Sequence, residues 1–406
     1  MMEPTTRSIL RTIYQRQPVT RRELCAQAGL SAGRISALVA QLIARGLVRE
    51  EVSQSGVPGR PAAWLTIDPE AGRVVGLDIG GRRSRAVLSD LGGRPLATLT
   101  RPTNVVQDRA RIVADILDLV EAVCREGNIA GAELLALGVG VQGIADARTG
   151  VVLGWPNTPA WTAPWTGLDV PAALSQDLKR PLIVLDDSVR AMGVMAQRFG
   201  PARGCANFLY VFLGNGIGSG VFVNGSPYRG SMGLAGELGH VTVEEGGALC
   251  SCGNRGCLEM VASTAGVLKR VDARLSEARL ASPLREAHER GELTLATLIE
   301  AARTGDKLAF QILDETGAYV GRVIAIAVNL LGPELVVLGG PLAQDGGIIL
   351  DAVQRQVRLR ALEHLSRQTR IVTDDQGELA GAHGAALLAL DALFNSSSRL
   401  AALLGD

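Results

Sequence analysis

The first fifty residues alternate between apolar stripes at helical spacing and short polar breaks. Residues 5–16 place their apolar side chains on one helical face, and Pro18 ends this segment. Thr20 and Glu23 then match a capping box, in which each side chain accepts a hydrogen bond from a backbone N–H that the helix leaves free. The pattern therefore predicts a first helix over residues 5–16 and a short second helix that ends at Ala28.

A third helix is predicted after the turn at Gly29 and Leu30, with Ser31 as its cap and Gly46 as its end. Its apolar side chains recur at positions i, i+3, i+4, i+7 and i+8, which makes one stripe. They are Ile35, Leu38, Val39, Leu42 and Ile43. The other face is polar and could reach phosphates or base edges in a major groove through Ser31, Arg34, Ser36 and Gln41.

Two short strands are expected next, over residues 47–52 and 62–67, joined by the loop SQSGVPGRP. Three helices followed by two strands and a loop make a winged helix-turn-helix, which we expect over residues 1–70. The extended Gly59-Arg60-Pro61 could place Arg60 in a minor groove, or could form only a rigid turn. A small protein-interaction domain is the alternative to a DNA-binding one.

The charge of the chain is unevenly distributed. Residues 1–60 contain nine arginines and four glutamates, a charge of +5, although the net charge of the 406-residue chain is zero. The remainder therefore carries −5. A basic segment on a neutral protein favours an anionic partner such as nucleic acid, although a solvated surface would have the same composition.

The length of 406 residues fits two or three domains, and 47% hydrophobic residues with 49 glycines are typical of an α/β protein. No apolar run approaches the ~20 residues of a membrane span. The beginning of the chain is basic but lacks the apolar stretch and cleavage site of a signal peptide. We therefore expect a cytoplasmic protein that does not enter a membrane.

Three apolar segments run into glycine turns, where backbone amides can approach phosphate oxygens. The residues concerned are Asp78, Gly80 and Gly81 in the first turn, Gly214, Gly216 and Gly218 in the second, and Gly339 and Gly340 in the third. In the first turn, Asp78 would sit where a metal–nucleotide complex binds. Three such turns in one body predict a two-lobed nucleotide-binding fold, although each alone could be only a turn, and the first could be a tight hairpin.

Two carboxylates, Asp186 and Asp187, follow the apolar segment 181–185. Strands of α/β proteins place ligand-binding groups at their carboxyl ends. One carboxylate could accept the proton of a sugar hydroxyl that attacks phosphate, and the other could bind sugar hydroxyls. Helix capping is the alternative, because Asp187 and Ser188 precede a helical run.

Three of the six cysteines cluster near a histidine, in the segment GELGHVTVEEGGALCSCGNRGCLE. Three thiolates and one imidazole make a closed tetrahedral zinc site, which indicates a structural metal. The predicted ligands are His240, Cys250, Cys252 and Cys257. Three unrelated buried cysteines are the alternative.

Together these motifs resemble the ROK family (repressors, open reading frames and kinases), in particular its repressor branch, over nearly the whole chain. The resemblance implies an α/β fold in which a winged helix-turn-helix precedes a two-lobed, actin-like body of the sugar-kinase (ATPase) type. The first lobe is expected over residues 71–190 plus 384–406, and the second, with the zinc site, over 191–383. The segment GAHGAALLALDALF would be the return to the first lobe.

The same resemblance implies that side chains in the interlobe cleft hold sugar hydroxyls. They are Asn157, Asp186 (commonly Asn in the kinases), Asp187, Glu237, His240 and Glu259. His240 would bind zinc through one ring nitrogen and face the sugar with the other. Asn157 could instead be only a turn residue between two prolines.

The phosphate-binding motifs depart from the kinase pattern. Arg82 stands where the kinases usually have Thr, and it could either bind phosphate or block the pocket. The second motif is GNGIG, where kinases often have GTGIG, and the third is GGP, where a further small residue is common. Asp187, the general base of a kinase, is kept. Sugar binding is therefore expected to persist and ATP use to be eroded.

We expect a sugar-responsive DNA-binding transcriptional regulator of carbohydrate genes, acting as a repressor, with zinc as its cofactor. Its partners would be a monosaccharide effector and an inverted-repeat operator bound by a homodimer or tetramer. An active ATP-dependent sugar kinase of the glucokinase or mannokinase type, with Asp187 as its catalytic residue, is the alternative. A scaffold that binds neither ligand is the third hypothesis. Glucose, mannose, N-acetylhexosamines and xylose share the expected contacts, so the sugar stays open.

Overall fold

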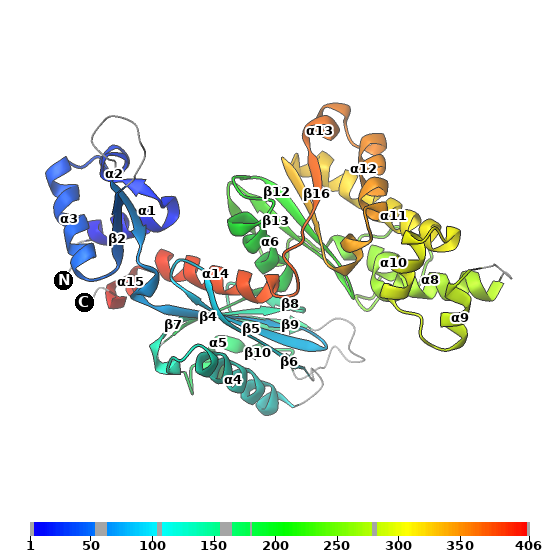
Figure 1. Ribbon diagram of the computed structural model, residues 1–406, viewed down its shortest axis with the longest axis horizontal. Coiled ribbons are helices and arrows are strands. Elements are labelled where there is room, and N and C mark those ends of the chain that lie inside the picture. The colour runs from blue at the N-terminus through cyan, green and yellow to red at the C-terminus, as the bar shows by residue number, and fades with distance from the viewer. Residues whose placement is uncertain are drawn as a thin grey trace.

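The computed structural model describes residues 4–52, 63–103, 108–154, 165–178, 181–277 and 282–403. Its first unit has three helices, α1 (Pro4–Arg16), α2 (Arg21–Ala28) and α3 (Ala32–Ala44). A small sheet of order β1-β3-β2 packs against them, built from β1 (Val19–Thr20), β2 (Val48–Val52) and β3 (Ala63–Ile67) (Figure 1). This is the predicted winged-helix order. The loop 53–61 and Arg60 lie outside the described residues.

The predicted caps and the glycine turn of α2 and α3 are present in the structure. Thr20 and Glu23 form the predicted capping box at α2, and the Ser31 side chain accepts a hydrogen bond from the Arg34 backbone N–H at the start of α3. Gly29 between them has a left-handed φ of 64°, which glycine adopts without steric cost. The apolar stripe of α3 is buried except for Ile43, which is partly buried.

The second unit is a five-stranded sheet of order β11-β7-β4-β5-β6. Its strands are β4 (Arg73–Ile79), β5 (Arg83–Asp90), β6 (Pro95–Pro102), β7 (Leu134–Val141) and β11 (Leu182–Asp187). Strands β4, β7 and β11 are parallel, so their carboxyl ends lie at one edge. Helix α4 (Arg109–Glu126) covers one face and α14 (Ala380–Asn395) covers the other (Figure 1).

Helix α14 lies directly on the backbone of this sheet. A Cβ added at Gly76 would stand 2.0 Å from the Ala382 carbonyl oxygen, and one at Gly138 would stand 1.9 Å from that of Ala385. Only glycine permits this approach. Smaller elements complete the unit: β8 (Ile144–Asp146), β9 (Val151–Gly154), β10 (Leu168–Asp169), α5 (Val170–Leu174) and the 3-10 turns η1 (Pro69–Ala71) and η2 (Gly131–Glu133).

The third unit is another five-stranded sheet, of order β14-β13-β12-β15-β16. Its strands are β12 (Phe208–Leu213), β13 (Ile217–Val223), β14 (Ser226–Tyr228), β15 (Leu335–Gly339) and β16 (Arg370–Thr373). Helix α6 (Ser188–Phe199) packs on one face, while α11 (Lys307–Leu331) and α12 (Ile348–Arg360) pack on the other (Figure 1).

The remaining elements surround this sheet and the end of the chain. They are α7 (Leu258–Ala262), α8 (Thr264–Glu277), α9 (Leu284–Glu289), α10 (Leu295–Arg303), α13 (Glu363–Gln368), α15 (Ser397–Leu403), η3 (Leu238–His240) and η4 (Pro341–Gln344). The lobe limits expected at 190/191 and 383/384 fall inside α6 and α14. Within the described part of the chain, no helix is both long and apolar enough to cross a membrane.

Candidate functional site

The four predicted metal ligands lie together in the third unit. His240 ends η3, Cys250 and Cys252 lie on the loop that follows, and Cys257 caps α7. One ligand atom from each residue lies within 4.8 Å of all the others. The Cys250 Sγ is 3.6 Å from the His240 Nδ1, and the Cys252 Sγ is 3.7 Å from the Cys257 Sγ. Three sulfur donors and one imidazole fit a metal ion with four protein ligands and no open position.

The loop backbone is adapted to this cluster. Gly256 has a φ of 67°, and a Cβ there would stand 1.7 Å from the Glu244 carbonyl oxygen. Val243 and Glu244 both donate their backbone N–H groups to the Gly256 carbonyl. Only glycine fits at position 256, so close to the Glu244 backbone. This close approach of the two segments brings Cys257 back towards His240.

The His240 ring separates the metal cluster from a carboxylate. Its Nδ1 faces Cys250, while its Nε2 lies 3.9 Å from the Glu237 Oε2. Glu237 is half exposed, and its charge helps raise the pKa of Asp187. One nitrogen of the ring therefore faces the predicted metal ligands, and the other faces Glu237, one of the expected sugar contacts.

Asp187 is the cap of α6. Its Oδ1 accepts hydrogen bonds from the backbone N–H groups of Val189 and Arg190, at 2.8 and 3.1 Å. The capping alternative is thus confirmed, and it leaves the second carboxylate oxygen for another role. Burial raises the pKa of Asp187 to about 6, against the opposing effect of Arg190 and with smaller contributions from Glu237 and Asp186.

Asp186 is held by two arginines that sequence analysis did not identify. Its Oδ1 accepts from the Arg190 Nε at 2.6 Å and from the Asp187 backbone N–H at 2.8 Å. Its Oδ2 accepts from the Arg229 Nε at 3.0 Å and Nη2 at 2.6 Å. Each oxygen thus accepts two hydrogen bonds, which uses its lone pairs. A sugar hydroxyl would bind Asp186 directly only after displacing one of these donors.

Arg229 and Arg190 also connect the two larger units. Arg229 follows β14 in the third unit, whereas Asp186 is the penultimate residue of β11 in the second. Arg190 is almost fully buried and donates through Nη1 to the Ala235 carbonyl, two residues before Glu237. The only signal for Arg190 in the sequence was its position four residues after Asp186, a spacing that pairs side chains on a helix.

Glu259 lies at the start of α7, two residues after Cys257. It is 7% exposed, and its Oε2 accepts a hydrogen bond from the Ile217 backbone N–H at 2.9 Å. A Cβ at Gly216 would stand 2.9 Å from the same oxygen. Gly216 therefore makes room for Glu259, which ties the metal loop to β13. Asn157 lies outside the described residues.

Asp78 is enclosed by protein groups at the carboxyl end of β4. It is 1% exposed; its Oδ1 accepts from the Ser188 Oγ at 2.6 Å, and its Oδ2 lies 3.7 Å from the Arg85 Nη1. Arg85 also donates to Glu378 at 2.9 Å. Burial raises the pKa of Asp78, against the effects of Ser188 and Arg85. Two protein groups thus surround the carboxylate that would face a metal–nucleotide complex in a kinase.

The first glycine turn is the tight hairpin that the sequence left open. The Gly80 N–H donates to the Arg83 carbonyl, and β4 pairs with β5 from Ile79 opposite Ser84. Gly81 and Arg82 are exposed at its tip.

The other two glycine motifs meet at one edge of the second large sheet. Gly339 pairs with Phe212, and a Cβ at Gly340 would stand 2.4 Å from the Leu213 carbonyl, directly before Gly214. Gly218 lies against Val189 of α6, where a Cβ would stand 2.8 Å from a methyl carbon. Close packing therefore requires glycine at several of these positions, independent of any phosphate.

The predicted DNA contacts of α3 are all exposed. Ser31, Arg34, Ser36 and Gln41 are exposed, while the apolar stripe of the same helix is buried. These side chains are therefore accessible to a macromolecular partner.

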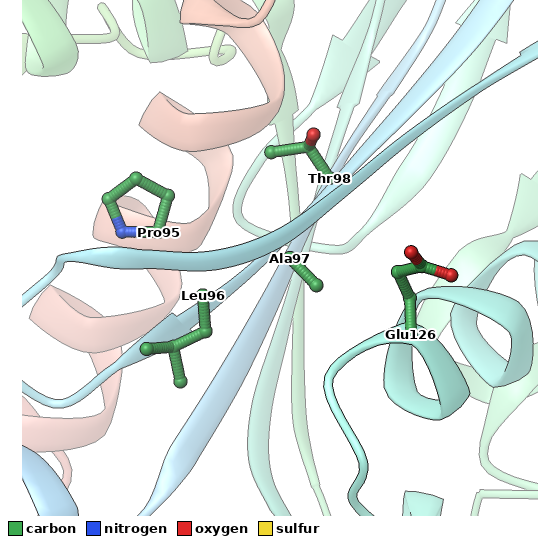
Figure 2. A pocket seen from close by; sticks show the side chains of 5 residues that line it. All are labelled: Pro95, Leu96, Ala97, Thr98 and Glu126. Atoms are coloured by element: carbon green, nitrogen blue, oxygen red, sulfur yellow. The ribbon is translucent and has the colours of Figure 1, made fainter.

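A separate hollow of about 390 Å³ lies between β6 and α4 (Figure 2). Its lining is Pro95, Leu96, Ala97, Thr98 and Glu126. These residues bring one carboxylate and one hydroxyl to a surface of mixed polarity. The carboxylates near the metal cluster come from other elements, so this hollow is not part of the candidate site.

The raised pKa of Asp187 gives a test of its environment. The pKa of about 6 in the folded state lies above the usual aspartate pKa of 3.8, so the folded state binds this proton more tightly and loses stability as pH rises through this window. Asn keeps a helix cap without the charge. Asp187→Asn is expected to be more stable than wild type by on the order of 2 kcal/mol near pH 7.5, and by roughly half that near pH 5.

Urea unfolding of both proteins at the two pH values measures this difference. A stability difference that stays constant with pH would show that Asp187 is not desolvated as described.

Comparisons with known proteins agree in family and in domain order. The model of the ROK family matches residues 74–392, and that of the MarR family matches residues 2–56. The DNA-binding transcriptional repressor Mlc of Escherichia coli is 29% identical over 403 residues, covering 98% of this chain and 95% of that protein. The DNA-binding transcriptional dual regulator NagC of the same organism is 28% identical, covering 91% and 88%.

Similarity extends to kinases over the body alone. A glucokinase of Halalkalibacterium halodurans is 30% identical over 76% of this chain and 93% of its own length. A solved ROK family transcriptional regulator, a homolog of E. coli Mlc, matches with a TM-score of 0.82 at 24% identity, covering 99% of this chain and 98% of its own. A ROK family glucokinase from Streptomyces griseus, solved with glucose and AMPPNP, matches with a TM-score of 0.67 at 26% identity, covering 78% and 99%.

Proposed function

Because this chain belongs to the ROK family and a MarR family model matches its N-terminal winged helix, we propose that it is a sugar-responsive transcriptional regulator, acting as a repressor of carbohydrate genes. The observation that carries the proposal is the presence of an exposed polar α3 face on the same chain as a sugar-kinase fold. Mlc and NagC, which are named as DNA-binding regulators, match this chain over both parts.

We propose that a monosaccharide or its derivative binds beside the metal cluster. Asp187, Glu237, His240 and Glu259 are its expected contacts, with Asn157 from the segment outside the described residues. Asp186 would take part either after release from Arg229 or by holding that arginine in place. The carboxylates accept hydrogen bonds from hydroxyl groups, which suits a polyhydroxylated ligand. We propose two lobes, over residues 71–190 plus 384–406 and over residues 191–383, whose limits lie inside α6 and α14.

Zinc is the metal that we propose for the four-ligand cluster, since thiolate and imidazole ligands in a closed set of four are typical of structural zinc. His240, Cys250, Cys252 and Cys257 would hold it. When bound, it would fix the orientation of the His240 ring and of the loop that leads to Glu259.

The proposed partner is double-stranded DNA with an inverted repeat, bound by a homodimer or tetramer. A symmetric dimer presents two α3 helices, so half-sites one helical turn apart, about 34 Å, would match it. The sugar changes DNA affinity only as far as it binds two arrangements of the protein differently.

A sugar kinase with an added DNA-binding domain is the second candidate, favoured by the similarity of the body to glucokinases. Enclosure of Asp78 by Ser188 and Arg85 argues against it, because that carboxylate would have to face the nucleotide's metal.

A thermal-shift screen with glucose, mannose, N-acetylglucosamine and xylose, paired with an ADP-release assay on the same sugars, tests the proposal. We expect at least one sugar to raise the melting temperature, with ADP release at background. ADP release above background that is lost in Asp187→Asn would establish the kinase instead. No thermal shift with any sugar would contradict the effector site.

A further inference from the structure

Helix α6 spans from the proposed sugar site to the DNA-binding domain. Its cap is Asp187, and its last turn carries Arg198, eleven residues and about 16 Å further along the helix axis. Arg190 in the first turn pairs with Asp186. The helix therefore has one end among the expected sugar contacts, while Arg198 at the other end contacts Tyr14 of α1. Helix α6 lies between α14 and the second large sheet (Figure 1).

Arg198 joins three helices at this far end. Its Nη2 donates to the Asp391 Oδ1 of α14 and to the Tyr14 hydroxyl of α1, the latter at 3.1 Å. The guanidinium carbon also lies 5.2 Å from the centre of the Tyr14 ring. Tyr14 in turn donates to Asp391 at 2.6 Å and stacks on Phe394 with ring centres 4.1 Å apart.

The packing around α6 leaves little space to absorb a displacement. A Cβ at Gly384 of α14 would stand 1.8 Å from the Ala191 carbonyl oxygen, so the two helix backbones touch. A Cβ at Gly193 would stand 2.3 Å from the Phe222 ring. One continuous hydrophobic core runs from α1 through α14 to α6 and both large sheets. Close-packed elements transmit small shifts instead of deforming locally.

Other contacts hold α1 to α14 and α15 independently of Arg198. Arg11 donates to the carbonyl oxygens of Phe394, at 3.2 Å, and Asn395, at 2.8 Å, while Arg7 donates to that of Ser397 at 3.4 Å. The DNA-binding domain should therefore stay docked when the Arg198 side chain is removed. Arg198 is thus placed to set the position of α1 without being needed to attach it.

We propose that Arg198 is a positioning residue that transmits occupancy of the sugar site through α6 to Tyr14, and thereby sets the position of the α3 helix on DNA. The proposal rests on the proposed function. A sugar that rearranges Asp186 and Arg190 moves the first turn of α6. The opposite end then changes its hydrogen bonds to Tyr14 and Asp391, and α1 carries α3 with it.

Arg198→Ala tests this, with Arg203→Ala, an exposed arginine just after α6, as the matched control. The DNA is a duplex that wild-type protein selects in vitro from a randomised library. The sugar is whichever of glucose, mannose, N-acetylglucosamine and xylose gives the largest thermal shift. Fluorescence anisotropy measures the DNA Kd with and without the sugar, and calorimetry measures the sugar Kd.

We expect Arg198→Ala to keep its sugar-free DNA Kd and its sugar Kd within about threefold of wild type, because it touches neither ligand. The ratio of DNA Kd values with and without sugar should fall from about fivefold or more to less than about twofold. Arg203→Ala should keep the wild-type ratio. Arg198→Lys, which keeps a charge beside Asp391, should restore part of this ratio. Adding Tyr14→Phe to Arg198→Ala should not lower the ratio further.

If Arg198→Ala keeps the wild-type ratio of DNA Kd values with and without sugar, the proposal is overturned. It is also overturned if the ratio falls only as much as the weaker binding of sugar accounts for. Failure of the proposed function is distinguishable, because wild-type protein would then select no DNA or show no response to sugar.

Discussion

Cys252→Ser is expected to lose both the bound metal and the response to sugar. The substitution removes one of four ligands, and the remaining loop no longer holds Cys257 and His240 around a common point. Glu259 follows Cys257 by two residues, and the His240 Nε2 faces Glu237, so both expected sugar contacts depend on the same loop. The thermal shift produced by sugar should fall by at least half, and bound zinc from about one per chain to near zero.

Cys25→Ser is the matched control, because Cys25 is also partly buried but lies in α2, away from the cluster. It should keep its zinc and its sugar response. Removing metal from the wild-type protein with a chelator and restoring it with zinc gives the same comparison without a substitution. If metal analysis of the wild type finds no zinc, or if Cys252→Ser keeps its sugar response without metal, the assignment of this cluster is wrong.

DNA affinity should fall steeply with salt, and Arg34→Ala should lower it further. A protein that neutralises several phosphates loses about two to five orders of magnitude in affinity between roughly 50 and 200 mM salt. Arg34 is exposed near the start of α3, outside the buried stripe. Its removal should weaken DNA binding about tenfold and, if its contact is to phosphate, reduce the salt slope by about one.

Anisotropy titrations at several salt concentrations measure both effects, with Arg203→Ala on the body as the control. Arg60→Ala should also weaken binding if the wing enters a minor groove. A salt-independent affinity, or equal losses in Arg34→Ala and Arg203→Ala, would rule out the proposed DNA surface.

The sequence predicted the winged helix well because its determinants are local. The capping box at Thr20, the cap at Ser31 and the apolar stripe of α3 each depend on residues within a few positions of one another. The metal cluster was predictable for a similar reason, since Cys250, Cys252 and Cys257 are close in sequence and His240 precedes them by ten residues.

The contacts that define the rest of the site are long-range, and no local pattern marks them. Arg229 reaches Asp186 across 43 positions, and Ser188 reaches Asp78 across 110. Tyr14 and Asp391 are 377 positions apart. The glycine turns were predicted to bind phosphate, and close packing at Gly218 and Gly340 gives a second, long-range reason for glycine that no local pattern marks. The lobe limits stay a prediction: they lie inside α6 and α14, two helices whose buried residues belong to a core shared by both large sheets.

The most direct test of sugar-regulated DNA binding measures the DNA Kd of the wild-type, metal-loaded protein with and without each sugar that gives a thermal shift. We expect tight, salt-sensitive binding to a selected inverted repeat, and a change of about fivefold or more in that Kd with at least one sugar. If each bound sugar leaves the DNA Kd unchanged, the protein is not the proposed sugar-responsive regulator.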